Sequence, residues 1–124
     1  MEPNNIYALY NIGYTKSIWG QYSEALSCFD KVIEISPEFA LSYNERGWVK
    51  MKMGSLEDGL QDVQQALQLD ETISEAYRNL GFYYMERRDL DRAFELFDKA
   101  KSMEPEMELI DGYLVEIKQR MSMS

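Results

Sequence analysis

SEAYRNLGFYYMERRDLDRAFELFDKAKSMEP, residues 74–105, carries the strongest structural signal in the chain. Its first half places apolar and small residues at helical intervals of three, four and seven: Tyr77, Leu80, Gly81 and Tyr84. After the polar break at residues 87–90, a second set has helical spacings of four and seven residues: Ala93, Phe97 and Ala100. Each set marks one apolar face of a helix. The stretch therefore predicts a helical hairpin.

The pattern recurs every 34 residues, as the matching glycines show: Gly13, Gly47 and Gly81. Leu26, Leu60 and Phe94 keep the same spacing within the second segments. A fixed period of this length is the mark of stacked supersecondary units, each too small to bury its own apolar face. We expect three hairpins stacked in sequence order.

Proline stands at the end of two units, at Pro37 and Pro105, whereas Glu71 takes this place in the middle unit. Because proline lacks an amide donor and restricts the residue before it, we expect both prolines to end the second helix of their unit.

Glycine, alanine, aromatic and proline residues at these offsets resemble the tetratricopeptide repeat pattern over residues 6–107. The third unit follows the pattern throughout, and the first keeps Gly13, Ala25, Phe29 and Pro37. The second departs from it at Arg46, Lys50, Gly59 and Glu71.

The resemblance implies an all-α fold, a right-handed α-solenoid of three antiparallel helix-turn-helix repeats. We place the repeats at about 6–39, 40–73 and 74–107, within a single domain that covers residues 1–124. Apolar residues at helical spacing after Pro105 predict a capping helix at about 108–121, which would cover the open face of the last hairpin.

The glycines at the 34-residue spacing predict close approach of the two helices in each hairpin. Gly59 lies inside the second helix of the middle unit, where glycine costs about 0.5–1 kcal/mol relative to alanine. The middle repeat is therefore expected to be the least stable.

Residues 1–3, Met-Glu-Pro, are in repeat register with residues 103–105, which have the same sequence. Two interpretations stay open: the chain is cut from a longer array, or it has a natural start that happens to carry this proline.

The chain has 22 acidic and 13 basic residues, a net charge of -9, which disfavours nucleic acid and anionic membranes as partners. We find no apolar run long enough to span a bilayer and no signal-peptide pattern. A single cysteine, Cys28, fits a reducing compartment. We therefore expect a cytoplasmic protein.

Catalysis is not expected, because the chain has no histidine and Cys28 has no partner residue to activate it. No calcium-loop spacing or phosphate-binding glycine loop is present in the sequence. We predict no catalytic residues, no metal site and no cofactor.

In such a solenoid the first helix of each repeat lines a concave groove. The predicted peptide-binding residues are Tyr7, Tyr10, Tyr14, Asn44, Trp48, Met51, Arg78, Phe82 and Met85. Three aromatic residues follow the repeated glycines and would form a row: Tyr14, Trp48 and Phe82. Such a row anchors a partner well, but it is equally compatible with packing between neighbouring helices.

Family members that bind the C-terminal carboxylates of chaperones use a clamp of lysines, arginine and asparagines. The matching positions here hold Tyr10, Tyr14, Glu45, Glu75 and Asn79, so a negatively charged peptide end is disfavoured. We expect a protein or peptide partner that is apolar or basic.

The function predicted from these features is a protein–protein interaction module with a scaffold or adaptor role. One alternative is self-association through the N-terminal hairpin, which is rich in Tyr7, Tyr10 and Trp19. Another is a small secretion-type or assembly chaperone.

Overall fold

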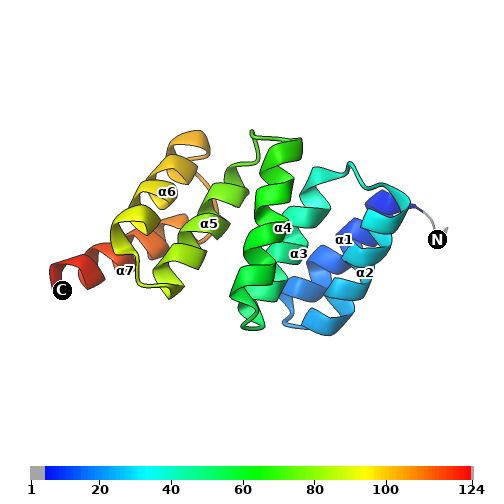
Figure 1. Ribbon diagram of the computed structural model, residues 1–124, viewed down its shortest axis with the longest axis horizontal. Helices are drawn as coiled ribbons and strands as arrows, with labels where there is room; N and C mark the ends of the chain where they lie inside the picture. Colours follow the sequence, from blue (N-terminus) through cyan, green and yellow to red (C-terminus); the bar gives the residue numbers. More distant parts are fainter. Residues whose placement is uncertain (1–4, 124) are drawn as a thin grey trace. The chain divides into compact units, whose positions relative to one another are not determined.

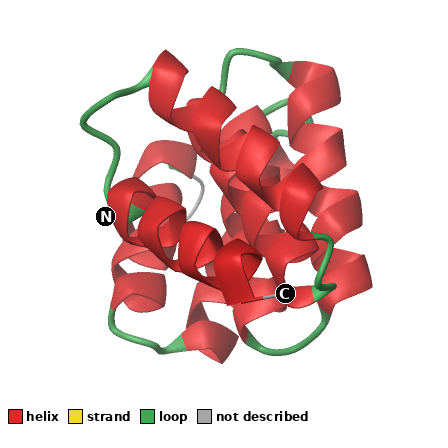
Figure 2. Cartoon of the chain, turned by 90° about the vertical axis from the view of Figure 1, so that its left-hand side faces the viewer, coloured by secondary structure: helices red, strands yellow, loops and turns green. Residues whose placement is uncertain are grey.

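Each 34-residue repeat folds as two helices joined by a short turn (Figure 1). The computed structural model describes residues 5–123, so Pro3 and its repeat register lie outside the described residues. The helices are α1 (Ile6–Ile18), α2 (Tyr22–Ile35), α3 (Ala40–Lys52), α4 (Leu56–Leu69), α5 (Ser74–Glu86), α6 (Leu90–Met103) and α7 (Ile110–Met123). Figure 2 shows only helices and connecting loops over this range. The all-α prediction is confirmed.

The chain divides into two compact units. Unit 1 ends at Glu71 and holds the hairpins α1–α2 and α3–α4, while unit 2 begins at Thr72 and holds α5, α6 and α7. The division falls two residues before the predicted boundary between the second and third repeats. The single domain over residues 1–124 stays a prediction.

The second helices of the first and third repeats end just before their prolines, as we predicted. α2 ends at Ile35 and α6 at Met103, in each case two residues before the proline. α4 ends at the same point of its repeat without a proline, because Asp70 takes an extended conformation with φ -156°. The proline therefore reinforces a helix end that the repeat also forms without it.

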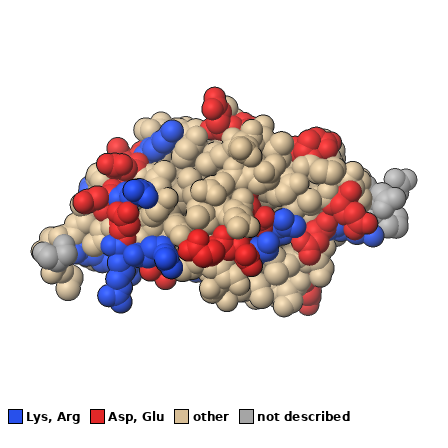
Figure 3. Space-filling view, in the orientation of Figure 1, with Lys and Arg blue, Asp and Glu red and all other residues tan. Residues whose placement is uncertain are grey.

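The turn inside each hairpin contains one residue in the left-handed region, at Gly20 (φ 76°), Gly54 (φ 95°) and Arg88 (φ 65°). Glycine adopts this conformation without steric cost, whereas in Arg88 the Cβ atom makes it sterically unfavourable. Figure 3 shows a group of basic side chains at the lower left, where the α5–α6 turn lies, with acidic side chains beside it. The basic run around Arg88 thus lies on an exposed turn that also carries the acidic residues Glu86 and Asp89.

In the first hairpin, α1 approaches α2 closely at Gly13. A Cβ atom at this position would lie 2.8 Å from Cε1 of Phe29 and 3.0 Å from Cβ of Cys28. Phe29 is buried together with Ala25 and Val49, which joins the first hairpin to α3. The close approach that we predicted from the glycine spacing is confirmed here.

In the middle hairpin, two glycines face one another. A Cβ atom at Gly47 would lie 2.7 Å from the carbonyl oxygen of Gly59, and one at Gly59 would lie 2.6 Å from the carbonyl oxygen of Gly47. The added Cβ atom at Gly59 would also lie 2.6 Å from the Cγ atom of Met51. Gly59 therefore has a packing role that offsets its poor helix propensity.

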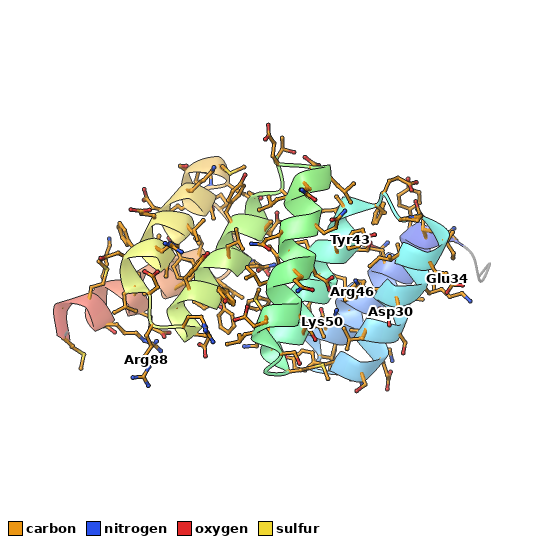
Figure 4. All side chains as sticks on the ribbon, viewed as in Figure 1. Asp30, Glu34, Tyr43, Arg46, Lys50 and Arg88 are labelled. Carbon is orange, nitrogen blue, oxygen red and sulfur yellow. The ribbon has the colours of Figure 1, made fainter. Side chains whose placement is uncertain are left out.

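The unusual charges of the middle repeat form one ionic network. Figure 4 labels three of its members, Asp30 on α2 and Arg46 and Lys50 on α3. Arg46 donates two hydrogen bonds of 2.8 Å to the carboxylate of Asp62 on α4 and one of 3.0 Å to Asp30 on α2. Lys50, one turn after Arg46, contacts Asp62 at 3.0 Å. The hydrogen bonds that Arg46 donates to Asp62 raise the pKa of Arg46 further above its usual range. Charges thus link three helices of unit 1.

In unit 2, α5 approaches α6 at Gly81, where a Cβ atom would lie 2.6 Å from Cδ1 of Phe97. α7 then packs on α6, burying Ile110, Leu114 and Ile117. The predicted cap is therefore present as a helix, and it begins two residues later than we expected from the sequence.

Replacing Gly59 with alanine tests the helix contact in the middle hairpin. Helix propensity alone predicts a gain in stability, but the added methyl group would overlap the Gly47 carbonyl. We expect a loss of about 1–3 kcal/mol in the free energy of unfolding, measured by urea denaturation. Gln64→Ala, at an exposed position of the same helix, is the control. A stabilised Gly59→Ala variant would contradict the close packing.

Replacing Asp62 with asparagine tests the ionic network. The variant leaves the charges of Arg46 and Lys50 without their shared carboxylate, so we expect a loss of about 1–2 kcal/mol in thermal or urea unfolding. Asp30→Asn should change stability by less than about 0.5 kcal/mol, because the Asp30 side chain is 63% exposed. Equal effects from both variants would show that Asp62 has no special role.

Candidate functional site

An exposed aromatic surface lies on α1. The Tyr10 ring stacks on Tyr14 with centroids 6.4 Å apart, and it meets Phe39 edge-on at 5.5 Å. Tyr7 also packs edge-on against Phe39, at 5.8 Å. Tyr7 and Tyr14 remain 67% and 40% exposed. The three predicted tyrosines are therefore neighbours, and Phe39 holds two of them in place.

Phe39 was missed by the sequence reasoning. It lies just before α3, where Ile73 and Met107 stand in the later repeats. Ile73 and Met107 are buried, whereas Phe39 is half-buried and supports Tyr7 and Tyr10. The 34-residue spacing of these large apolar residues is the signal that could have identified the position.

Of the three predicted residues on α3, Trp48 is partly exposed. The ammonium group of Lys52 lies 5.4 Å from the centre of the Trp48 ring, a cation–π distance. Asn44 and Met51 are buried, and Met51 packs against Gly59 within the hairpin. Trp48 is thus the residue of this set that a partner could reach, with the exposed Lys52 beside it.

The three predicted residues of unit 2, Arg78, Phe82 and Met85, are all buried. Arg78 donates a 3.3 Å hydrogen bond to the carbonyl oxygen of Glu108, just before α7. Phe82 meets the Tyr113 ring of α7 edge-on at 6.1 Å. In this unit, Arg78 and Phe82 hold the capping helix.

The Tyr113 ring also stacks on Phe97, with centroids 5.1 Å apart and ring planes only 4° from parallel. Burial raises the pKa of the Tyr113 hydroxyl. Tyr113 therefore joins α7 to both α5 and α6 through Phe82 and Phe97. For Phe82, packing within the unit accounts for the aromatic residue that follows the repeated glycine. The peptide-binding role of the aromatic row stays a prediction.

The positions that match the carboxylate clamp carry no basic side chain. In unit 1 these are Tyr10 and Tyr14, which belong to the aromatic surface, and the buried Glu45. In unit 2 they are Glu75 and the buried Asn79, whose side-chain oxygen accepts hydrogen bonds from Arg78. At these five described positions, the lysine and arginine side chains of the family's carboxylate clamp are therefore replaced by tyrosine, glutamate and asparagine.

Cys28 lies half-buried beside Gly13 in the first hairpin. Burial raises the pKa of its thiol, which disfavours the thiolate form that acts as a nucleophile. Within residues 5–123, no cluster of three or more histidine, cysteine, aspartate or glutamate side chains has a metal-binding arrangement. No helix in the described part of the chain is long and apolar enough to cross a bilayer.

Comparison with curated proteins finds relatives that are much longer than this chain. The mitochondrial import receptor subunit TOM70 of Rattus norvegicus is 28% identical over 109 residues, 86% of this chain and 18% of that protein. The Hsp70-Hsp90 organizing protein 1 of Glycine max is 29% identical over 93 residues, 74% of this chain and 16% of that protein. The chain thus spans less than a fifth of these relatives.

Among solved structures, the first TPR domain of Spaghetti (RPAP3) bound to the HSP90 peptide SRMEEVD superposes with a TM-score of 0.79. The two are 19% identical, over 98% of this chain and 97% of that one. The Sgt2 TPR domain of Aspergillus fumigatus gives a TM-score of 0.80 at 20% identity, over 98% of this chain and 81% of that one. These likenesses show the fold.

The tetratricopeptide repeat family model matches residues 6–39 and again residues 74–107, which are the bounds we predicted for the first and third repeats. Together the two matches cover more than half of the chain. The seven helices of residues 5–123 agree with three such repeats and a capping helix. This chain belongs to the tetratricopeptide repeat family.

Proposed function

We propose that the chain is a protein-interaction module that binds a peptide segment or a partner protein, with a scaffold or adaptor role. The observation that carries the proposal is the aromatic surface on α1, formed by Tyr7, Tyr10 and Tyr14, together with the partly exposed Trp48 on α3. Family membership and the named relatives, which include a peptide-bound TPR domain, support a binding role rather than a catalytic one.

The aromatic surface suits a peptide with apolar anchors. Tyrosine and tryptophan can bury a large area with little loss of side-chain freedom, and their polar groups can still bond to a peptide backbone. The same two helices also carry exposed apolar side chains, Ile18 on α1 and Leu41 on α3. A partner could therefore bury several of its apolar residues here.

We also propose that the partner carries basic residues next to its apolar anchor residues. The chain carries a net charge of -9, so it attracts cations over a long range. The Spaghetti (RPAP3) domain binds the acidic peptide SRMEEVD, but the clamp positions of this chain hold tyrosine, glutamate and asparagine. We propose that this chain discriminates against such acidic C-terminal peptides.

Self-association through the first hairpin is less well supported. On α3, the face that packs on the preceding hairpin buries Ser42, Glu45 and Val49. Two of the equivalent residues on α1, Asn11 and Thr15, are polar and exposed. This face of α1 therefore offers little apolar surface on which a second copy could stack. A small secretion-type or assembly chaperone remains a special case of the binding role, and a cytoplasmic location stays our proposal.

Selecting peptides from a random displayed library against the full chain tests the proposal. We expect the selected sequences to be rich in apolar residues and in lysine or arginine. Tyr14→Ala and Trp48→Ala should each weaken binding of a selected peptide about tenfold or more, because each removes an aromatic anchor. Fluorescence polarisation of labelled peptide measures the affinity.

Ile35→Ala is the matched control, because Ile35 is a similarly exposed apolar residue on α2 of the same unit. It should leave the affinity unchanged. A peptide that ends in MEEVD should bind more weakly than the selected ones. Affinity that is independent of both Tyr14 and Trp48 would contradict the proposed site, and preferred binding of the acidic peptide would contradict the proposed partner class.

A further inference from the structure

The capping helix α7 has an outward face that its own unit leaves uncovered. Val115 and Leu109 are 57% and 59% exposed, and a Cβ atom at Gly112 would meet no atom within 4 Å. Figure 2 shows α7, the helix that ends near C, at the front of its unit. Glycine is unfavourable inside a helix, and no contact within the described chain accounts for Gly112.

The repeat register explains what this face is. Val115 lies 34 residues after Gly81, so α7 stands in the place of the first helix of a further repeat. In the hairpins of this chain, a second helix packs antiparallel over the equivalent position, at Gly47 and Gly81 for example. At Val115, no helix of the described chain does so.

A shallow groove of about 380 Å³ lies beside Val115, between α6 and α7. Phe94 and Leu114 contribute apolar surface to it, and Asp111 and Lys118 lie along the α7 side. Asp111 pairs with Lys101 of α6, and the Lys118 ammonium group lies 5.9 Å from the centre of the Phe94 ring. The groove therefore has an apolar centre and charges of both signs at its edge.

The charges on α7 are arranged so that the helix is complementary to itself. Asp111 lies four residues before Val115 and Lys118 lies three after it. In an antiparallel pair of α7 helices centred near Val115, Asp111 of each copy stands within one residue of the level of Lys118 of the other. Gly112 lies level with Lys118 of the second copy and adds no side chain there.

We propose that two copies of this chain associate through α7, each α7 lying antiparallel on the other in the place that a second helix takes in the other hairpins. The contact is isologous, which means that both copies use the same surface of α7. This inference is independent of the proposed peptide-binding surface, which lies on α1 and α3 of unit 1.

Sedimentation velocity of the full chain over a range of concentrations, up to about 0.5 mM, tests the proposal. We expect a reversible dimer. Val115→Asp should abolish it, because it places a charge at the centre of the contact. A monomer throughout the range would overturn the proposal, and so would a dimer that is unchanged in Val115→Asp.

Two charge reversals give a sharper test. Lys118→Asp gives a face with two acidic residues and Asp111→Lys one with two basic residues, so each variant alone should dimerise about tenfold more weakly or worse. An equimolar mixture should recover dimers, because each copy then meets the opposite charge. Mixing cannot repair a folding defect, so a mixture no better than its components would overturn the antiparallel arrangement.

Trp19→Ser is the control for the competing surface on the first hairpin, where Trp19 is strongly exposed. It should leave the dimer unchanged, whereas a dimer lost in Trp19→Ser and kept in Val115→Asp would place the contact on α1 instead. Circular dichroism of each variant should show the helix content of the parent chain.

Discussion

The close approach of two helices at a glycine is the constraint from which the rest of each hairpin follows. At Gly13, Gly47 and Gly81, a Cβ atom would lie within 2.6–2.8 Å of an atom on the second helix. This contact fixes which face of each first helix turns inward. The face that it leaves free is where α1 carries Tyr7 and Tyr14.

The middle repeat satisfies the same constraint with different residues. Where its neighbours use alanine, Gly59 lets the two backbones touch, and Arg46 and Lys50 share Asp62 across the hairpin. Removing paired charges from water costs free energy, so the network adds little to the overall stability. Its main effect is to favour the one arrangement of helices in which every charge finds its partner. Three of the departures from the repeat pattern, Arg46, Lys50 and Gly59, therefore have partners within unit 1, and the lower stability of the middle repeat stays a prediction.

Periodicity predicted the helices, their ends and the glycine contacts, because these depend on residues at fixed spacing. It could not predict the partners of Arg46, since Asp30 and Asp62 each lie 16 residues away and many acidic residues compete for that role. Nor could it predict that α7 would cover Phe82. A repeat pattern places a side chain on a helix face, but the contacts of that face depend on the neighbouring element.

The three first helices thus have the same fold but different surroundings. Phe82 of α5 is 8% exposed beneath the cap, whereas α1 presents its tyrosines to solvent. Backbone amide NMR shifts of the full chain, titrated with a library-selected peptide, would locate the binding surface. The account predicts shifts concentrated on α1 and α3 around Tyr14 and Trp48, and shifts concentrated in unit 2 would contradict it.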